Sequence, residues 1–140
     1  IRLDGSRVEP HTFGQVNPFG LAMDPLGPFY TADCHRAPVY QLIRGAFYPS
    51  FGKPHDGLGF APTLMEHAHG STAICGIVYY DDQLWPTSFK DNVFIGNVMT
   101  SRLNRDILIA RGSSKKAIEQ PDLLSSRDPW FPSISRVSLA

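Results

Sequence analysis

The chain has 140 residues, of which 42% are hydrophobic and 19% are charged, a composition typical of a folded domain rather than of a disordered segment. Its 13 basic residues balance 13 acidic ones, so no net charge attracts nucleic acid or an anionic membrane surface. No apolar run approaches the ~20 residues that a membrane-spanning helix needs. We therefore expect a folded protein with no nucleic-acid partner and no transmembrane segment in these residues.

The first part of the chain predicts a three-strand meander. Residues 20–23, 29–34 and 38–43 are short segments rich in apolar, aromatic and β-branched side chains, separated by polar residues. The first connection, DPLG, carries proline and glycine where a type I or II turn favours them. Residues 44–70 follow as a long loop rich in glycine and proline, and loops of this length in a compact domain are usually functional.

The second part of the chain predicts further strands. Their patterns cover residues 72–80, 92–99 and 103–110. A single helical turn is expected at 88–90, within the turn-rich DDQLWPTSFKDN. KKAIEQPDLLSS (115–126) predicts a short helix interrupted by Pro121, and FPSISRVSLA (131–140) predicts the start of another strand.

The fold class follows from what these patterns lack. No segment has the i, i+3, i+4, i+7 apolar stripe of a long amphipathic helix, so the chain is predicted to be all-β. Sandwich, barrel and propeller all fit the pattern, and meanders that recur after long loops favour a β-propeller. At ~40–50 residues per blade, the chain supplies about three blades of four-stranded antiparallel meanders, whereas closed propellers have four or more. We expect residues 1–140 to be a propeller fragment, part of one domain whose other blades lie outside this chain.

Cys34 and His35 suggest a haem or metal site at first sight, but the spacing disfavours it. Covalent haem attachment needs two cysteines in a C-x-x-C-H motif, and only one precedes His35. Structural zinc needs about four ligands, and Cys75 lies in an apolar strand without a neighbouring ligand. We expect Cys34 and Cys75 to be buried free thiols, with a single disulfide as the alternative.

The EHAHGST segment is a stronger candidate for chemistry. His67 and His69 are two residues apart, so in an extended segment both side chains point the same way. They suit a metal site, with His55 or Asp56 as a further ligand, or a general base. The alternative is a solvated loop whose histidines bond to backbone carbonyls.

The TSRLNRD segment offers planar hydrogen-bond donors. Alternation places Arg102 and Asn104 on one face of the strand and Arg105 on the other. Paired donors of this kind suit a carboxylate or a quinone oxygen, and a polar strand edge is the equal alternative.

Several stretches together resemble a known family. GQVNPFGLAMDPLGPFYTADCHRAPVYQLIRGAFYPSFGKPHDGLGF, HGSTAICGIVYYDDQLWP and FKDNVFIGNVMTSRLNRD resemble the membrane-bound dehydrogenase family of planctomycetes and verrucomicrobia, the haem-binding CxxCH proteins. The similarity runs through residues 3–130, and the family is related to the soluble glucose and sorbosone dehydrogenases. In such proteins a propeller dehydrogenase domain is commonly followed by a C-x-x-C-H cytochrome domain.

The resemblance implies an exported, periplasmic or membrane-associated quinoprotein with pyrroloquinoline quinone (PQQ) and calcium as cofactors. Haem c would lie only on a domain outside this chain. The cofactor-binding residues carried over are Asn17, Asp33, His35, Arg102 and Asn104, with Asp33 as the calcium ligand. The soluble sugar dehydrogenases have an arginine-asparagine-proline motif whose arginine and asparagine hold the quinone; this sequence keeps Asn17 and Pro18, and Val16 replaces the arginine. The superfamily's catalytic histidine belongs to an earlier blade, so His69 is assigned as the catalytic base in its place.

The sequence is compatible with three functions. The leading hypothesis is a fragment of a quinoprotein-like oxidoreductase that oxidises a sugar or polyol alcohol or aldehyde and passes electrons to a cytochrome domain. The second is a non-catalytic propeller that binds carbohydrate or a protein partner. The third is a metal-dependent hydrolase that uses His67 and His69.

Overall fold

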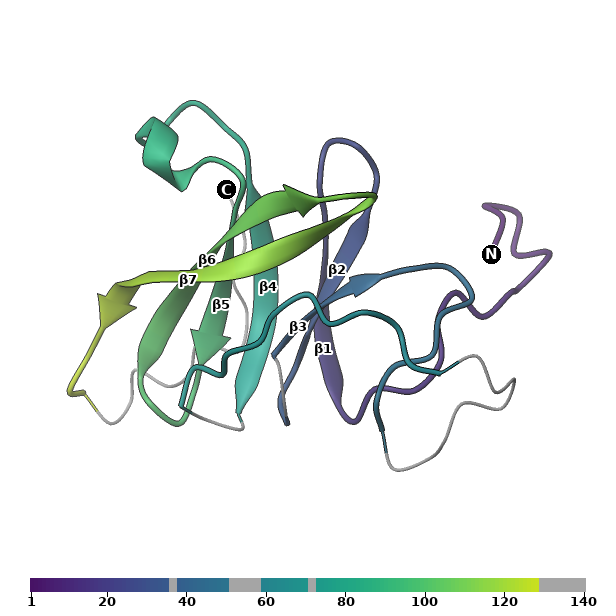
Figure 1. Ribbon diagram of the computed structural model, residues 1–140, viewed down its shortest axis with the longest axis horizontal. Coiled ribbons are helices and arrows are strands. Elements are labelled where there is room, and N and C mark those ends of the chain that lie inside the picture. Colours follow the sequence, from purple (N-terminus) through teal and green to yellow (C-terminus); the bar gives the residue numbers. More distant parts are fainter. Residues whose placement is uncertain (36–37, 51–58, 71–72, 129–140) are drawn as a thin grey trace.

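The structure, a computed structural model, describes residues 1–35, 38–50, 59–70 and 73–128. It is all-β, with two antiparallel sheets, as expected for a propeller-like fragment (Figure 1). In chain order the elements are β1 (Pro18–Met23), β2 (Phe29–Asp33), β3 (Val39–Leu42), β4 (Ile74–Tyr80), the 3-10 helix η1 (Thr87–Phe89), β5 (Asn92–Asn97), β6 (Arg102–Arg111) and β7 (Ser114–Ser125).

The first sheet has the order β1-β2-β3, which confirms the predicted meander. The DPLG turn closes between β1 and β2, where Gly27 N–H donates to the Asp24 carbonyl at 3.0 Å. The Asp24 carboxylate also accepts the Leu26 N–H at 2.8 Å. Aspartate at the first turn position and glycine at the last are therefore used as turn chemistry predicts.

The second sheet is a four-stranded meander with the order β4-β5-β6-β7. All six residues of β5 are buried, and the strand pairs with β4 and β6 along its two edges. The predicted helical turn is confirmed as η1, whose end is closed by Lys90 N–H donating to the Thr87 carbonyl at 3.1 Å.

The two sheets pack against each other through their first strands, β1 and β4 (Figure 1). Gly20 permits this contact: it has a φ of +86°, and a Cβ there would lie 3.0 Å from the Ile77 nitrogen. Between the sheets, the rings of Tyr30 and Tyr79 stack with centroids 6.1 Å apart. The core cluster comprises Tyr30, Ala32, Val39, Leu64, Met65, Ile74, Ile77, Tyr79, Val93, Ile95, Leu108 and Ala117.

The helix predicted over 115–126 is wrong, because all of these residues except Ser126 belong to β7. The segment pairs with β6 over its length, and this long-range pairing overrides the local helical tendency of KKAIEQ. Pro121 is compatible with the strand for two reasons. It lies on the last strand of the sheet, and it falls within a register shift opposite Leu103 and Arg105, where no regular ladder bond is required.

The described residues of the long loop contribute an isolated bridge between Phe13 and Phe47 and no named strand. The described part of the chain therefore forms two blade-like sheets. The strand expected in 131–140 lies outside the described residues.

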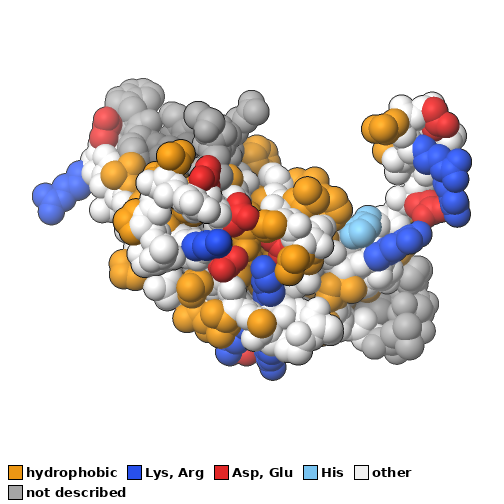
Figure 2. All heavy atoms as spheres, turned by 90° about the horizontal axis from the view of Figure 1, so that it is seen from above, with side chains coloured by type: hydrophobic (Ala, Val, Ile, Leu, Met, Phe, Trp, Pro, Cys, Tyr) orange, Lys and Arg blue, Asp and Glu red, His pale blue; other side chains and the backbone are white. Residues whose placement is uncertain are grey.

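The surface carries mixed charge. Figure 2 shows basic and acidic side chains interspersed with apolar ones on one face, in keeping with the balanced composition. Within the described ranges, no helix has the length and apolarity needed to cross a bilayer.

Candidate functional site

The candidate site is built where the loop before β4 runs along β7. Ala117 N–H donates to the Leu64 carbonyl at 2.8 Å, and the next residue, Met65, is buried in the core. Lys116 Nζ forms an ion pair with Glu66 Oε2 at 3.2 Å. These contacts hold the loop against the second sheet.

His67 and His69 both turn toward one carboxylate on β6, which confirms that the two side chains face the same way. His67 Nε2 lies 2.7 Å from Asp106 Oδ1, and His69 Nε2 lies 2.7 Å from Asp106 Oδ2. The side chains of Asp106 and His69 are 0% and 1% exposed, whereas that of His67 is 24% exposed. A buried carboxylate thus has an imidazole at each oxygen, and one of the two imidazoles is accessible to solvent.

The other nitrogen of His69 also faces an acid. Its Nδ1 is buried without a hydrogen bond in the described part of the chain, and Glu119 Oε1 lies 3.5 Å away, an ion-pair distance. Burial by itself lowers the pKa of the His69 imidazole. The hydrogen bond and charge of Asp106, with help from the charge of Glu119, outweigh burial and raise that pKa above its ordinary value.

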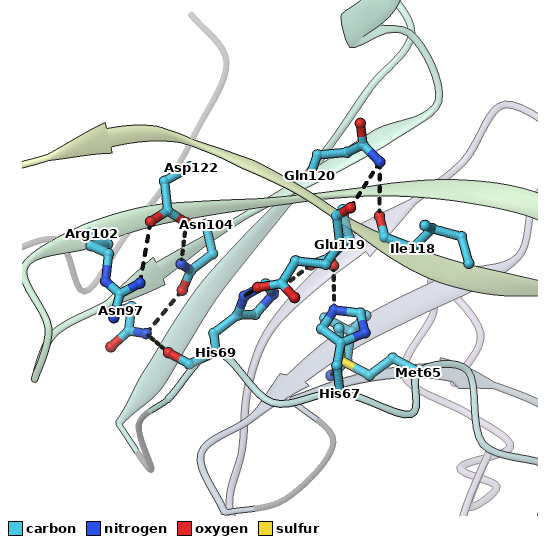
Figure 3. A network of polar contacts seen from close by, with 12 residues as sticks. Met65, His67, His69, Asn97, Arg102, Asn104, Ile118, Glu119, Gln120 and Asp122 are labelled. Atoms are coloured by element: carbon cyan, nitrogen blue, oxygen red, sulfur yellow. Dashed lines mark hydrogen bonds and ion pairs between the residues drawn. The ribbon is translucent and has the colours of Figure 1, made fainter.

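A chain of hydrogen bonds extends from His69 to the start of β6 and to Asp122 on β7 (Figure 3). Asn97 Nδ2 donates to the His69 carbonyl at 3.0 Å and to Asn104 Oδ1 at 2.9 Å. Asn104 Nδ2 donates to Asp122 Oδ1 at 2.6 Å, and Arg102 Nη1 donates to Asp122 Oδ2 at 3.3 Å. The structure therefore joins three of the residues predicted from sequence, His69, Arg102 and Asn104, in one network.

The other predicted residues form a separate group at the ends of β1 and β2. Asp33 is buried, and its carboxylate accepts the backbone N–H groups of Val16 at 2.9 Å, Asn17 at 3.4 Å and His35 at 3.1 Å. The Asn17 side-chain amide donates to Cys34 Sγ at 3.0 Å. His35 is exposed. Asp33 thus holds the segment that precedes β1 and the turn that follows β2.

Both cysteines are free, as expected, but they are half-buried rather than buried. Burial raises the pKa of the Cys75 thiol, and the neighbouring Cys34 adds to the rise. The two thiols line a cavity of about 310 Å³ together with Asn17, Phe19, Ala73, Ile74 and Val98.

Sequence reasoning missed the acids of the site. Asp106 has the same parity as Asn104 on β6, so alternation alone was enough to place both on one face. Glu119 and Asp122 were hidden by the assignment of β7 as a helix. His55 and Asp56, the ligands considered from sequence, lie outside the described residues.

Similar proteins were found among solved structures but not among curated proteins, none of which matches the chain. The fold is similar to the crystal structure of the "putative oxidoreductase (glucose dehydrogenase)" from Thermus thermophilus, with a TM-score of 0.64 and 16% sequence identity. That alignment covers 89% of this chain and 36% of the other, so the chain spans about a third of the protein it resembles. At this identity the likeness establishes the fold. A family model matches residues 1–137, and the chain belongs to that family, the Domain of unknown function (DUF7133).

Proposed function

We propose that the chain is part of a quinoprotein-like oxidoreductase domain that oxidises an alcohol or aldehyde group of a sugar or polyol. The observation that carries the proposal is the fold, which over 89% of the chain is similar to that of a protein described as a glucose dehydrogenase. An exported location and an electron-accepting cytochrome domain belong to the same proposal and rest on the family resemblance of the sequence.

The residues expected to hold quinone and calcium do not fit one cofactor cradle in the described part of the chain. Asp33, the expected calcium ligand, already accepts three backbone N–H groups in a buried position. In the side-chain amide of Asn104, the oxygen accepts a hydrogen bond from Asn97 and the nitrogen donates one to Asp122. These side chains support the fold around the site, and we derive no catalytic step through a quinone.

Arg102 is the predicted residue best suited to bind a ligand. Its side chain is 38% exposed, and one nitrogen of the guanidinium bonds Asp122 at 3.3 Å. The guanidinium has five N–H donors, so others are available for the oxygens of a substrate or cofactor. His69 as the catalytic base stays a prediction, because its side chain is 1% exposed and its nitrogens face carboxylates.

A non-catalytic propeller that binds carbohydrate or a protein partner is the second candidate. The observation that favours it is that several of the expected cofactor ligands bond to other groups of the protein. Asn17, for example, donates its side-chain amide to Cys34 Sγ. Val16, at the position of the family arginine, contributes a backbone N–H to Asp33 instead of a guanidinium.

The test is a dye-linked dehydrogenase assay on the full-length protein, with aldoses and polyols, in the presence and absence of PQQ and calcium. Activity that depends on both additions supports an oxidoreductase. Arg102→Gln should then lower kcat/KM about tenfold or more, since a charge-assisted hydrogen bond is worth about 1.5–3 kcal/mol. Arg111→Gln, at the exposed end of β6, is the matched control and should have no effect. Carbohydrate binding without turnover under any condition would favour the second candidate.

A further inference from the structure

Two carboxylates lie opposite each other in the second sheet. Asp106 on β6 and Glu119 on β7 are register partners, so their side chains are neighbours on the same face of the sheet. Like charges in this relation destabilise a sheet, and the side chain of Asp106 is 0% exposed, so water does not offset its charge. A positive charge between the loop and the sheet would offset the repulsion between these two carboxylates.

The imidazoles of His67 and His69 in the loop point toward Asp106. One ligand atom from each of His67, His69 and Asp106 lies within 4.8 Å of the others. The ring centroids of the two histidines are 5.1 Å apart and the planes are nearly perpendicular, at 85°. Because the Leu64 carbonyl, three residues before His67, accepts a hydrogen bond from Ala117 on β7, the backbone as well as Asp106 holds the two histidines in place.

We propose that His67, His69 and Asp106 bind a divalent transition-metal ion of the zinc class. Two imidazole nitrogens and one carboxylate oxygen are a donor set that Zn²⁺ prefers, whereas Ca²⁺ and Mg²⁺ prefer oxygen donors alone. Bonds of ~2.0 Å to a tetrahedral ion place its ligand atoms ~3.3 Å apart. Each histidine Nε2 now lies 2.7 Å from a different oxygen of Asp106, and the three ligand atoms lie within 4.8 Å of one another, so these side chains need to shift by roughly an ångström to hold the ion.

The surroundings of His69 match those of a metal-bound histidine. Such a histidine usually donates its other ring N–H to a carboxylate, which fixes the tautomer and the ring orientation. Here Glu119 Oε1 lies 3.5 Å from Nδ1, a buried atom with no hydrogen bond in the described residues. Three protein ligands leave a tetrahedral ion one position for water, and the 24% exposure of His67 gives that position a route to solvent.

The proposal concerns binding and is independent of any oxidoreductase activity, so direct metal titration tests it. The full-length protein is stripped with EDTA, dialysed, and titrated with Zn²⁺ by calorimetry and with Co²⁺ by visible absorption. We expect one ion at this site and the strong visible bands of tetrahedral Co²⁺. His67→Gln should weaken Zn²⁺ binding at this site at least 100-fold, and Glu119→Gln should weaken it about 10- to 100-fold.

The controls separate loss of a ligand from loss of the fold. His11→Gln replaces a histidine elsewhere in the described structure and should leave both titrations unchanged. Because Asp106 is buried, Asp106→Asn is informative only if its near-ultraviolet circular dichroism matches that of the parent protein. If the spectra differ, His67→Gln decides the test, because His67 is partly exposed and its replacement should leave the fold intact. Absence of saturable binding in the parent protein, or equal binding by the parent and the folded His67→Gln variant, would overturn the proposal.

Discussion

Replacing Asp24 by asparagine should destabilise the contact between the two sheets by about 3 kcal/mol, the lower end of the cost of breaking a buried ion pair. The Asp24 side chain is 0% exposed, and its Oδ2 accepts the Tyr30 hydroxyl at 2.8 Å and Lys115 Nζ at 2.9 Å. Lys115 comes from β7, in the other sheet, and its ammonium lies 5.1 Å from the centre of the Tyr79 ring. The substitution leaves that cation without its carboxylate in a largely buried position.

The assay is thermal and urea denaturation of the parent protein, Asp24→Asn, Lys115→Met and the double variant. A loss of about 3 kcal/mol corresponds to a fall in melting temperature of about 10 °C for a chain of this size. The double variant should lose less than the sum of the single variants, with a coupling energy of about 2 kcal/mol. Arg44→Gln breaks an exposed ion pair, with side chains 75% and 44% exposed, and should cost less than about 1 kcal/mol.

The effect of Asp24→Asn should also depend on pH. Burial by itself raises the pKa of the Asp24 carboxyl, but the hydrogen bonds from Lys115 and Tyr30 overcome it and hold that pKa below its ordinary value of 3.8. The stabilisation is therefore present above 3.8 and is lost as pH falls through the lower, folded value. The gap between parent and variant should be constant from about pH 7 to 5 and close in stronger acid. Additive single variants, or a gap that widens as pH falls, would refute this reasoning.

Two further predictions concern glycine and cysteine positions. Gly14→Ala should lower the free energy of unfolding by several kcal/mol, because Gly14 has a φ of +81° and an added Cβ would lie 2.1 Å from the Tyr48 carbonyl oxygen. Gly112 also has a positive φ, of +61°, but an added Cβ there would meet no neighbouring atom, so Gly112→Ala should cost only about 1 kcal/mol in the same denaturation assay. Equal losses would show that the Tyr48 contact does not matter. Because its pKa is raised, Cys75 should be alkylated by iodoacetamide at pH 8 more slowly in the folded protein than in the urea-unfolded protein, as measured by peptide mass spectrometry, and equal rates would contradict this.

Local sequence patterns were sufficient for much of the fold. Short runs of apolar, aromatic and β-branched residues located the first six strands to within two residues at either end, and DPLG located the first turn. These features depend on neighbours in the chain. KKAIEQ is the counterexample, since its neighbours favour a helix and its partner strand, β6, makes it part of β7.

The sequence by itself determined that His67 and His69 share a face, because their spacing of two is enough in an extended segment. Only the tertiary structure decided what they face. Asp106 is 39 and 37 residues away from them along the chain, and it meets both because the loop is bonded to β7 and β7 is in register with β6. The hydrogen-bond partners were also decided by packing: Asp33 bonds to the backbone of Val16, Asn17 and His35, whereas Arg102 and Asn104 bond to Asp122. Contacts of this range depend on strand register and on the packing of one element against another, which residue type and local spacing do not specify.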